Sequence, residues 1–185
     1  MFRRGFTLVE LMISLGILMI VSSLMLVVTG SGRVSWSVAA AKLYLTAQER
    51  QASTIISQEL MLSRYIPASG ASLKFNIPLV DSDTGDLKRT SAGDLKWGDG
   101  ETEGNYIEYV KEVDANNLLR RILNSSSSEV SRRVIARDVQ SFNVTALPTT
   151  RQYQIVINFS IDRYLGGRLP SPISSNTTLE ITPMN

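Results

Sequence analysis

A run of acidic residues in the middle of the chain is the first candidate for chemistry. Asp81, Asp83 and Asp86 lie close together around Gly85. Hard cations such as Ca²⁺ bind carboxylate and carbonyl oxygens that a tight turn holds in place, so these three residues form a candidate calcium loop. The loop departs from the EF-hand pattern, because Gly85 and Asp86 occupy the fifth and sixth positions in reversed order and Ala92 stands where a bidentate Glu is required. A solvated polar loop is the simpler alternative.

Two pairs of adjacent arginines are candidates for a nucleic-acid patch. They are Arg120 with Arg121, and Arg132 with Arg133. Clustered arginines neutralise phosphates, but neighbouring side chains on a strand point to opposite faces, so these pairs need not cluster. The net charge of +2 adds little support for nucleic acid. We therefore expect proteins as partners, with DNA binding as the alternative and a solvated surface as the simplest interpretation.

The residue inventory disfavours catalysis. The chain contains no cysteine and no histidine. This removes thiolate zinc sites, Cys or Ser nucleophiles paired with His, and acid–base chemistry on imidazole. The sequence also holds no phosphate-binding glycine loop and no dinucleotide-binding pattern. We expect no catalytic residue and no cofactor other than the calcium considered above, and a membrane-anchored enzyme is the less favoured alternative.

Glu10 is the one acidic residue in an apolar run from Phe6 to Val28. A helix over this run is about 35 Å long at about 1.5 Å per residue, enough to cross a hydrocarbon core of about 30 Å. A signal peptide has a shorter apolar region, and a simple anchor has no use for a carboxylate that costs several kcal/mol in lipid. Arg3 and Arg4 precede the run, which predicts a cytoplasmic N-terminus with the rest of the chain outside.

The segment from Arg4 to Leu11 resembles, position by position, the cleavage and assembly motif of type IV pilin-like proteins. The resemblance implies that a prepilin peptidase cleaves after Gly5 and methylates the new N-terminal Phe6. It implies that Glu10 then pairs with the amine of Phe6 in a neighbouring subunit, which neutralises two charges that would otherwise lie unpaired in an apolar core. It also implies a location in a bacterial inner membrane, with the C-terminal domain in the periplasm. The implied partners are an inner-membrane assembly platform and other pilins, and the implied final location is a filament or its tip.

The elements that follow this front segment must continue its helix and provide a folded domain for it. Residues 34–66 show apolar side chains at spacings of three and four, which predicts an amphipathic helix. Pro67 and Gly70 predict its end, and Gly30 and Gly32 predict a kink or a local break where the span leaves the membrane. We expect a leader over 1–5, a membrane and assembly segment over 6–28, an amphipathic segment over 29–66, and a β-rich periplasmic domain over 67–185.

After Gly70 the apolar period changes from 3.6 to 2, which predicts antiparallel strands. The expected elements are a short strand at 73–77, a hairpin of 105–113 with 117–123, a polar loop at 124–128, a helix or strand at 131–138, an inward face of Phe142, Val144 and Ala146, a central strand at 152–161, a loop over 166–172, and a final short strand at Leu179 and Ile181. The fold class is α+β, a long N-terminal helix packed on an antiparallel sheet.

The β-rich part also resembles particular members of the family. The segments that look like the J-type minor pseudopilin of type II secretion and the PilW-like minor pilins are residues 52–66, the hairpin around Leu119, the segment from Arg133 to Phe142, the central strand at 152–161 and the last seven residues. The absence of cysteine disfavours a major pilin, in which a C-terminal disulfide is common. The resemblance implies a minor subunit that joins other minor subunits and the major subunit and helps to start filament growth. The alternative is a pilus subunit acting in adhesion, twitching motility or DNA uptake.

Overall fold

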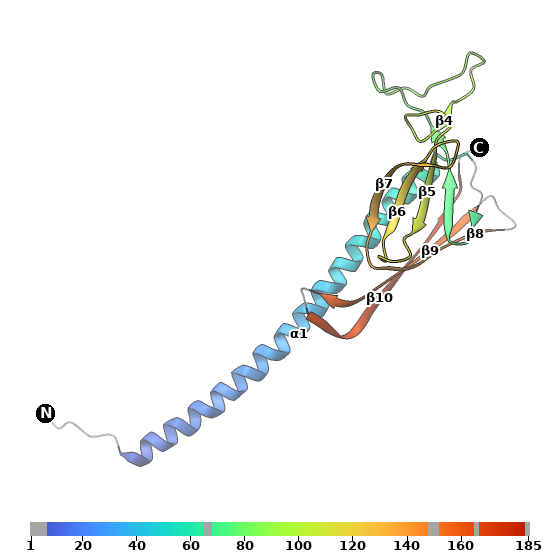
Figure 1. Cartoon of the computed structure of the whole chain (residues 1–185). Coiled ribbons are helices and arrows are strands. Elements are labelled where there is room, and N and C mark those ends of the chain that lie inside the picture. The colour runs from blue at the N-terminus through green and yellow to red at the C-terminus, as the bar shows by residue number, and fades with distance from the viewer. Residues whose placement is uncertain (1–6, 65–67, 148–151, 165–166, 184–185) are drawn as a thin grey trace.

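The computed structural model describes residues 7–64, 68–147, 152–164 and 167–183. One helix, α1 (Leu8–Met61), precedes all the strands. Figure 1 shows that its N-terminal half projects from the β domain, while its C-terminal half lies against the strands. The strands are β1 (Ala68–Ser69), β2 (Ser72–Phe75), β3 (Ile77–Pro78), β4 (Trp97–Gly98), β5 (Tyr106–Lys111), β6 (Leu118–Leu123), β7 (Glu129–Ala136), β8 (Val139–Ala146), β9 (Tyr153–Tyr164) and β10 (Gly167–Ile181). The predicted α+β class is confirmed.

Helix α1 is continuous through Gly30 and Gly32, so the predicted break there is wrong. A Cβ atom added at either glycine would meet no atom within 4 Å. The helix continues through both residues. The helix also ends at Met61, before the predicted end at 66, because Leu62 turns its N–H back to the Glu59 and Leu60 carbonyls. Residues 65–67 lie outside the described part of the chain.

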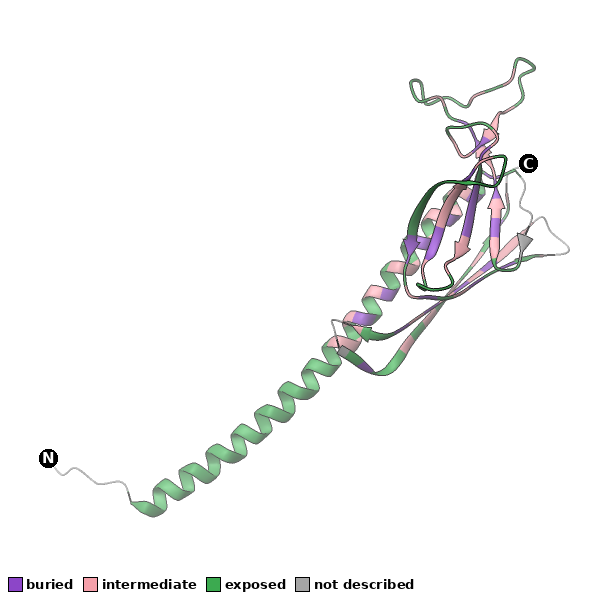
Figure 2. Cartoon of the chain, in the orientation of Figure 1, coloured by how far each residue is buried: buried purple, intermediate pink, exposed green. Residues whose placement is uncertain are grey.

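One face of the C-terminal half of α1 is buried. Its fully covered residues recur at spacings of four and seven, so they share one side of a 3.6-residue helix: Ala41, Leu45, Ala52, Ile56 and Leu60. Other apolar residues of the segment 34–66 lie outside this stripe and are exposed: Ala39, Leu43 and Leu62. Figure 2 shows the change from an exposed to a partly buried helix near its middle.

The strands form two main sheets, with the orders β1-β2-β5-β6-β7 and β10-β9-β8, and a small sheet of β3 and β4. All the strand pairs are antiparallel. The main sheets meet where the Val144 N–H donates to the Gly70 carbonyl at 2.9 Å. Both sheets contribute to one core with α1, which includes Phe75, Tyr109, Phe142 and Phe159. The strands therefore act as one curved cover for the helix.

The hairpin of β5 and β6, the polar loop after it and the central place of β9 confirm the sequence predictions. Of residues 131–138, predicted as either a helix or a strand, 131–136 belong to the strand β7 (Glu129–Ala136), and residues 137 and 138 form the bend before β8. Ala146 is exposed, so it does not belong to the inward face of β8 that Phe142 and Val144 form.

The C-terminal prediction of a loop followed by a short strand is wrong, because β10 spans fifteen residues. Pro170 and Pro172 fall inside the register shift between Arg168 and Ile173, where β10 is not paired regularly with β9. Proline is tolerated on an edge strand and at a bulge, because no ladder N–H is lost there. Two prolines therefore mark a bulge in this strand and do not end it.

A test of the continuous helix uses the two glycines. Gly30→Ala and Gly32→Ala should each stabilise α1 by about 1 kcal/mol, because alanine has the higher helix propensity and its methyl group meets no neighbour. Circular dichroism and amide hydrogen exchange of the full chain in detergent micelles measure the change. Ser31→Ala is the matched control and should give a smaller gain. Lower helicity in the glycine variants would contradict a continuous helix.

Candidate membrane and assembly site

The N-terminal half of α1 has no partner within the chain. Every residue from 7 to 36 is exposed, and the large apolar side chains between Leu8 and Val28 are 47% to 77% exposed. Within the described residues, α1 is the one helix long and apolar enough to cross a membrane. An apolar surface of this size is not stable in water and requires lipid or other protein around it. This segment is therefore a candidate site for contact with lipid and with other proteins.

Glu10 lies in the first turn of this helix. Thr7 has an extended backbone conformation and caps the helix, and its hydroxyl oxygen accepts the Glu10 N–H at 3.3 Å. This hydrogen bond is the N-cap contact that threonine makes at the start of a helix, and an acidic group in the first turn is stabilised by the helix dipole. The Glu10 side chain itself is exposed. Local structure therefore holds the backbone of Glu10 and leaves its carboxylate open to a partner. Gly5 and Phe6, the predicted processing residues, lie outside the described residues.

Glu59 connects α1 to the five-stranded sheet. Its carboxylate accepts the Tyr109 hydroxyl at 2.6 Å and the Arg120 Nε–H at 2.9 Å. Tyr109 is fully buried, and its ring stacks on Phe75. Burial raises the pKa of Tyr109 above its ordinary value, and the negative charge of Glu59 raises it further. This cluster fixes the helix against the sheet at the end far from the membrane segment.

Three further polar contacts hold α1 to the strands. The Tyr44 hydroxyl donates to Asp138 at 3.0 Å, the Gln48 side chain accepts the Arg137 N–H at 2.9 Å, and Ser175 donates to Glu49. They lie along the helix between its middle and the Glu59 cluster. The helix is therefore held to both main sheets over several turns.

The two adjacent arginines of β6 point to opposite faces, as the strand period predicts. Arg120 faces α1, whereas Arg121 binds Glu108 at 2.8 Å and Glu129 at 3.6 Å on the other face of the sheet. Glu108 is buried and also lies 3.7 Å from Lys74. Since these guanidinium groups already have carboxylate partners, they do not form an open basic patch.

The calcium candidates lie in the long loop between β3 and β4. The Asp81 carboxylate accepts the N–H groups of Asp83 and Thr84 at 2.9 and 3.3 Å, and these hydrogen bonds lower the pKa of Asp81. Asp83 and Asp86 are exposed. No group of three or more acidic, His or Cys side chains in the described residues is placed to hold a metal ion. The turn thus uses Asp81 as a local acceptor, and calcium binding stays a prediction.

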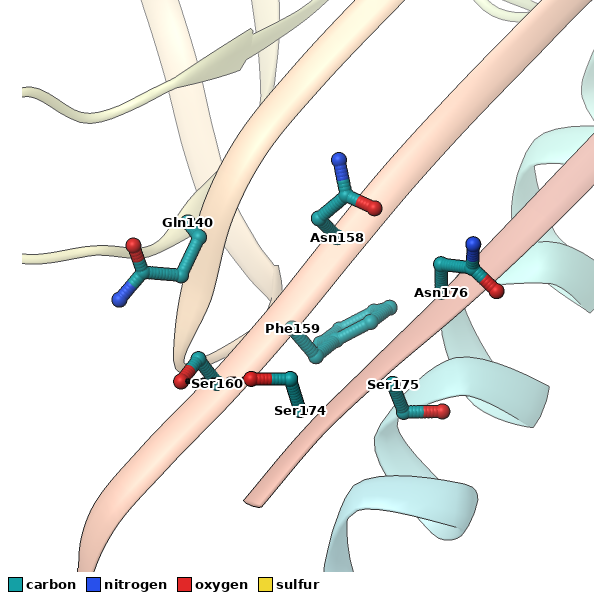
Figure 3. Close-up of a pocket in the computed structure, with 7 residues that line it drawn as sticks. All are labelled: Gln140, Asn158, Phe159, Ser160, Ser174, Ser175 and Asn176. Carbon is teal, nitrogen blue, oxygen red and sulfur yellow. Dashed lines mark hydrogen bonds between the residues drawn. The ribbon is translucent and has the colours of Figure 1, made fainter. Parts of the chain in front are cut away.

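A shallow cavity of about 470 Å³ opens on the three-stranded sheet. Asn158 donates to Ser141 at 2.7 Å and Ser174 donates to Ser160 at 3.2 Å across neighbouring strands. Figure 3 shows the amide and hydroxyl groups around the cavity, which is lined by Gln140, Asn158, Phe159, Ser160, Ser174, Ser175 and Asn176. None of these residues is an acid or a base. The cavity offers hydrogen bonds and no group suited to proton transfer.

Sequence reasoning missed the Glu59 cluster and the full length of β10. The signal for Glu59 was present, because it follows Ala52 and Ile56 on the covered face of the helix, but its partners Tyr109 and Arg120 are distant in sequence. Pro170 and Pro172 indicated a loop and so hid the first half of β10.

Comparison with known families identifies the front of the chain. A model described as the prokaryotic N-terminal methylation motif, the prepilin motif of type IV pilin-like proteins, matches residues 1–26. No curated protein and no solved structure matches the chain. The motif and the apolar helix fit a protein anchored in a membrane by a single span.

The Glu59 cluster predicts a stability change at alkaline pH. Tyr109→Phe removes a hydrogen bond to a charged group and should lower the free energy of unfolding by about 1.5–3 kcal/mol at pH 7. The pKa of Tyr109 is raised in the folded state, so its contribution is complete below about pH 10, the ordinary tyrosine value, and is lost as the pH rises above it. Denaturant unfolding at pH 7, 9 and 10.5 measures both effects.

The matched control is Tyr106→Phe on the same strand, whose side chain is exposed. It should change the free energy of unfolding by less than about 0.5 kcal/mol. The decline between pH 9 and 10.5 should be shallower in Tyr109→Phe than in the unaltered chain. Equal declines would show that the Tyr109 hydroxyl has no such role.

Proposed function

We propose that the chain is a minor pilin-like subunit, made as an inner-membrane precursor and assembled through α1 into a periplasmic filament or its tip complex. The observation that carries this proposal is the methylation motif at residues 1–26, which includes the first part of the exposed apolar helix α1. A simple anchor explains the apolar surface, but it explains neither the motif nor Glu10. The helix serves first as a membrane span and then as the element that packs among the helices of other subunits.

Cleavage after Gly5 creates a positively charged amine at Phe6. The exposed carboxylate of Glu10 in one subunit pairs with this amine in the next, and the pair removes two unpaired charges from an apolar surrounding. Because the Thr7 cap fixes the start of the helix, the carboxylate lies at a defined position along the axis. Glu10 thus sets the axial register of the assembled subunit.

The machine to which the subunit belongs is proposed to be a type II secretion pseudopilus, in the role of the J-type minor subunit. The support for this type is the likeness of the β domain to it, and the absence of cysteine favours a minor subunit over a major one. A strain lacking the chain should fail to secrete its type II substrates. Normal secretion together with lost twitching motility or DNA uptake would instead identify a PilW-like pilus subunit.

Processing supplies the first test. Gly5→Leu should block cleavage, because a branched side chain hinders access of the peptidase at the cleaved bond. Intact mass spectrometry of membrane fractions should find the unprocessed precursor, whereas Gly5→Ala, with a much smaller side chain, should still yield a chain that starts at a methylated Phe6. A mature Gly5→Leu product with the mass of the unaltered one would disprove the cleavage proposal.

The role of Glu10 supplies the second test. Glu10→Gln keeps the size of the side chain and removes its charge, so membrane insertion and cleavage should be retained. Incorporation into sheared filaments or tip complexes should fall at least tenfold, equivalent to about 1.4 kcal/mol, because the neighbouring amine loses its partner. Ser14→Ala, one turn further along the exposed helix, is the matched control. Undiminished incorporation of Glu10→Gln would remove Glu10 from the assembly mechanism.

A further inference from the structure

Strand β10 forms an outer edge of the three-stranded sheet. Figure 1 shows it running lengthwise beside α1. Its odd-numbered side chains from Ile173 to Leu179 are half-buried on the helix side, where Ser175 donates to Glu49, and the even-numbered ones are exposed. Its pairing with β9 is regular from Ile173 to Ile181. The outer side of this nine-residue stretch is therefore a straight strand edge.

Hydrogen bonds on the far side of β9 show which backbone groups of β10 point outward. In an antiparallel pair, a residue either exchanges both bonds with the residue opposite or turns both groups away. Val144 donates its N–H to Gly70, so it turns away from β9, and its partner Ile155 must bond instead to Leu179 of β10.

A second hydrogen bond leads to the same assignment of the outward backbone groups. Ser160 donates its N–H to the Asp138 carbonyl, on the β8 side, so Ser160 and the opposite Ser174 do not bond to each other through their backbones. The alternation then turns the N–H and C=O groups of every second residue outward: Ser174, Asn176, Thr178 and Glu180. These four residues are exposed. Among the described residues, none of their outward backbone groups has a backbone partner.

The chemistry of this edge differs from that of the other outer strand beside the helix. Strand β7 carries Glu129, Arg132 and Arg133, and its pairing with β6 shifts register at both ends. Charges and bulges are the usual protection of an edge against strand addition. From Ile173 to Ile181, β10 has no proline and one charged residue, Glu180. The edge of β10 is open, and that of β7 is protected.

The occupant of this edge is a strand from a different protein. A second copy anchored in the same membrane has its helix pointing the same way, and an antiparallel pairing of two β10 strands would turn the helices in opposite directions. The other outer strand of a second copy, β7, is charged and bulged. The remaining outer strand of each main sheet, β1 or β8, lies where the two sheets meet at the Gly70–Val144 hydrogen bond, so the edges that a copy leaves free, those of β7 and β10, are poor partners.

We propose that an extended strand of another membrane-anchored protein adds to β10 over Ser174–Glu180, antiparallel to it. The four outward residues supply four N–H donors and four C=O acceptors, the backbone ladder by which strand addition gains affinity. The cavity in Figure 3 continues from Ser174 and Asn176 onto the sheet, so uncharged, short polar side chains of the partner suit this edge. The inference rests on the proposed function only for the shared orientation of membrane-anchored helices.

The test uses the absence of cysteine from the chain. Ser174→Cys and Thr178→Cys are made one at a time in the full-length protein, each is labelled with a short photo-crosslinker in native membranes, and the linked peptides are sequenced by mass spectrometry. Both sites should link to one extended segment of one different protein. Because the strands run antiparallel, the residue linked to position 178 should precede the residue linked to position 174, by about four positions.

The backbone requirement is tested by Asn176→Pro. Proline lacks the outward N–H but leaves the bonds between β10 and β9 in place, so the domain should fold and crosslinking from position 178 should fall at least tenfold. Asn176→Ala keeps the N–H and is the matched control, with crosslinking within twofold of the unaltered chain. Circular dichroism checks the folding of both variants.

Crosslinking to a second copy, links in the same order along both chains, no crosslink, or equal crosslinking in Asn176→Pro and Asn176→Ala would overturn the inference. Membrane fractionation and N-terminal mass of the same samples report the proposed function separately. A processed chain in the membrane with no strand partner refutes the edge proposal alone. An unprocessed or soluble chain refutes the proposed function.

Discussion

The structure depends on a single helix that meets two different environments. The covered face of α1 from Ala41 to Leu60 packs on the strands, whereas the residues from 7 to 36 meet nothing within the chain. The buried face stabilises the domain, because each large aliphatic side chain removed from water contributes about 1.5–3 kcal/mol. The exposed half has no such compensation and requires an apolar surrounding. Since the helix is unbroken, both requirements act on one rigid element.

The polar contacts between helix and sheets fix the rotation of α1 about its own axis. Hydrophobic burial alone would tolerate some rotation of α1, but Glu59 must meet Tyr109 and Arg120 at the same time. Tyr44 and Gln48 add contacts near the middle of the helix. A continuous helix transmits rotation along its length, so the direction in which Glu10 points is linked to the placement of the sheet edges. The register proposed for Glu10 would therefore also orient β10.

Sequence patterns predicted the parts of the fold that follow from local period and turn chemistry. The alternating strand β9 and the hairpin of β5 and β6 belong to this class, and so does the covered stripe of α1 around Leu45 and Ile56. The patterns failed where tertiary context overrides a local signal. Gly30 and Gly32 do not interrupt α1, and the prolines of β10 lie in a bulge. The Glu59 cluster joins residues that are far apart in sequence, which a local period cannot reveal.

The asymmetry between the two outer strands would limit the strand addition proposed at β10. A sheet with two open edges can add strands on both sides and so continues into an extended assembly. Here charges and register shifts protect β7, and β10 presents one uncharged stretch between its bulge and Glu180. One added strand would occupy that stretch and leave no second site of the same kind. An edge of this type suits a subunit that joins one specific neighbour, which agrees with a minor subunit and not with one that repeats along a filament.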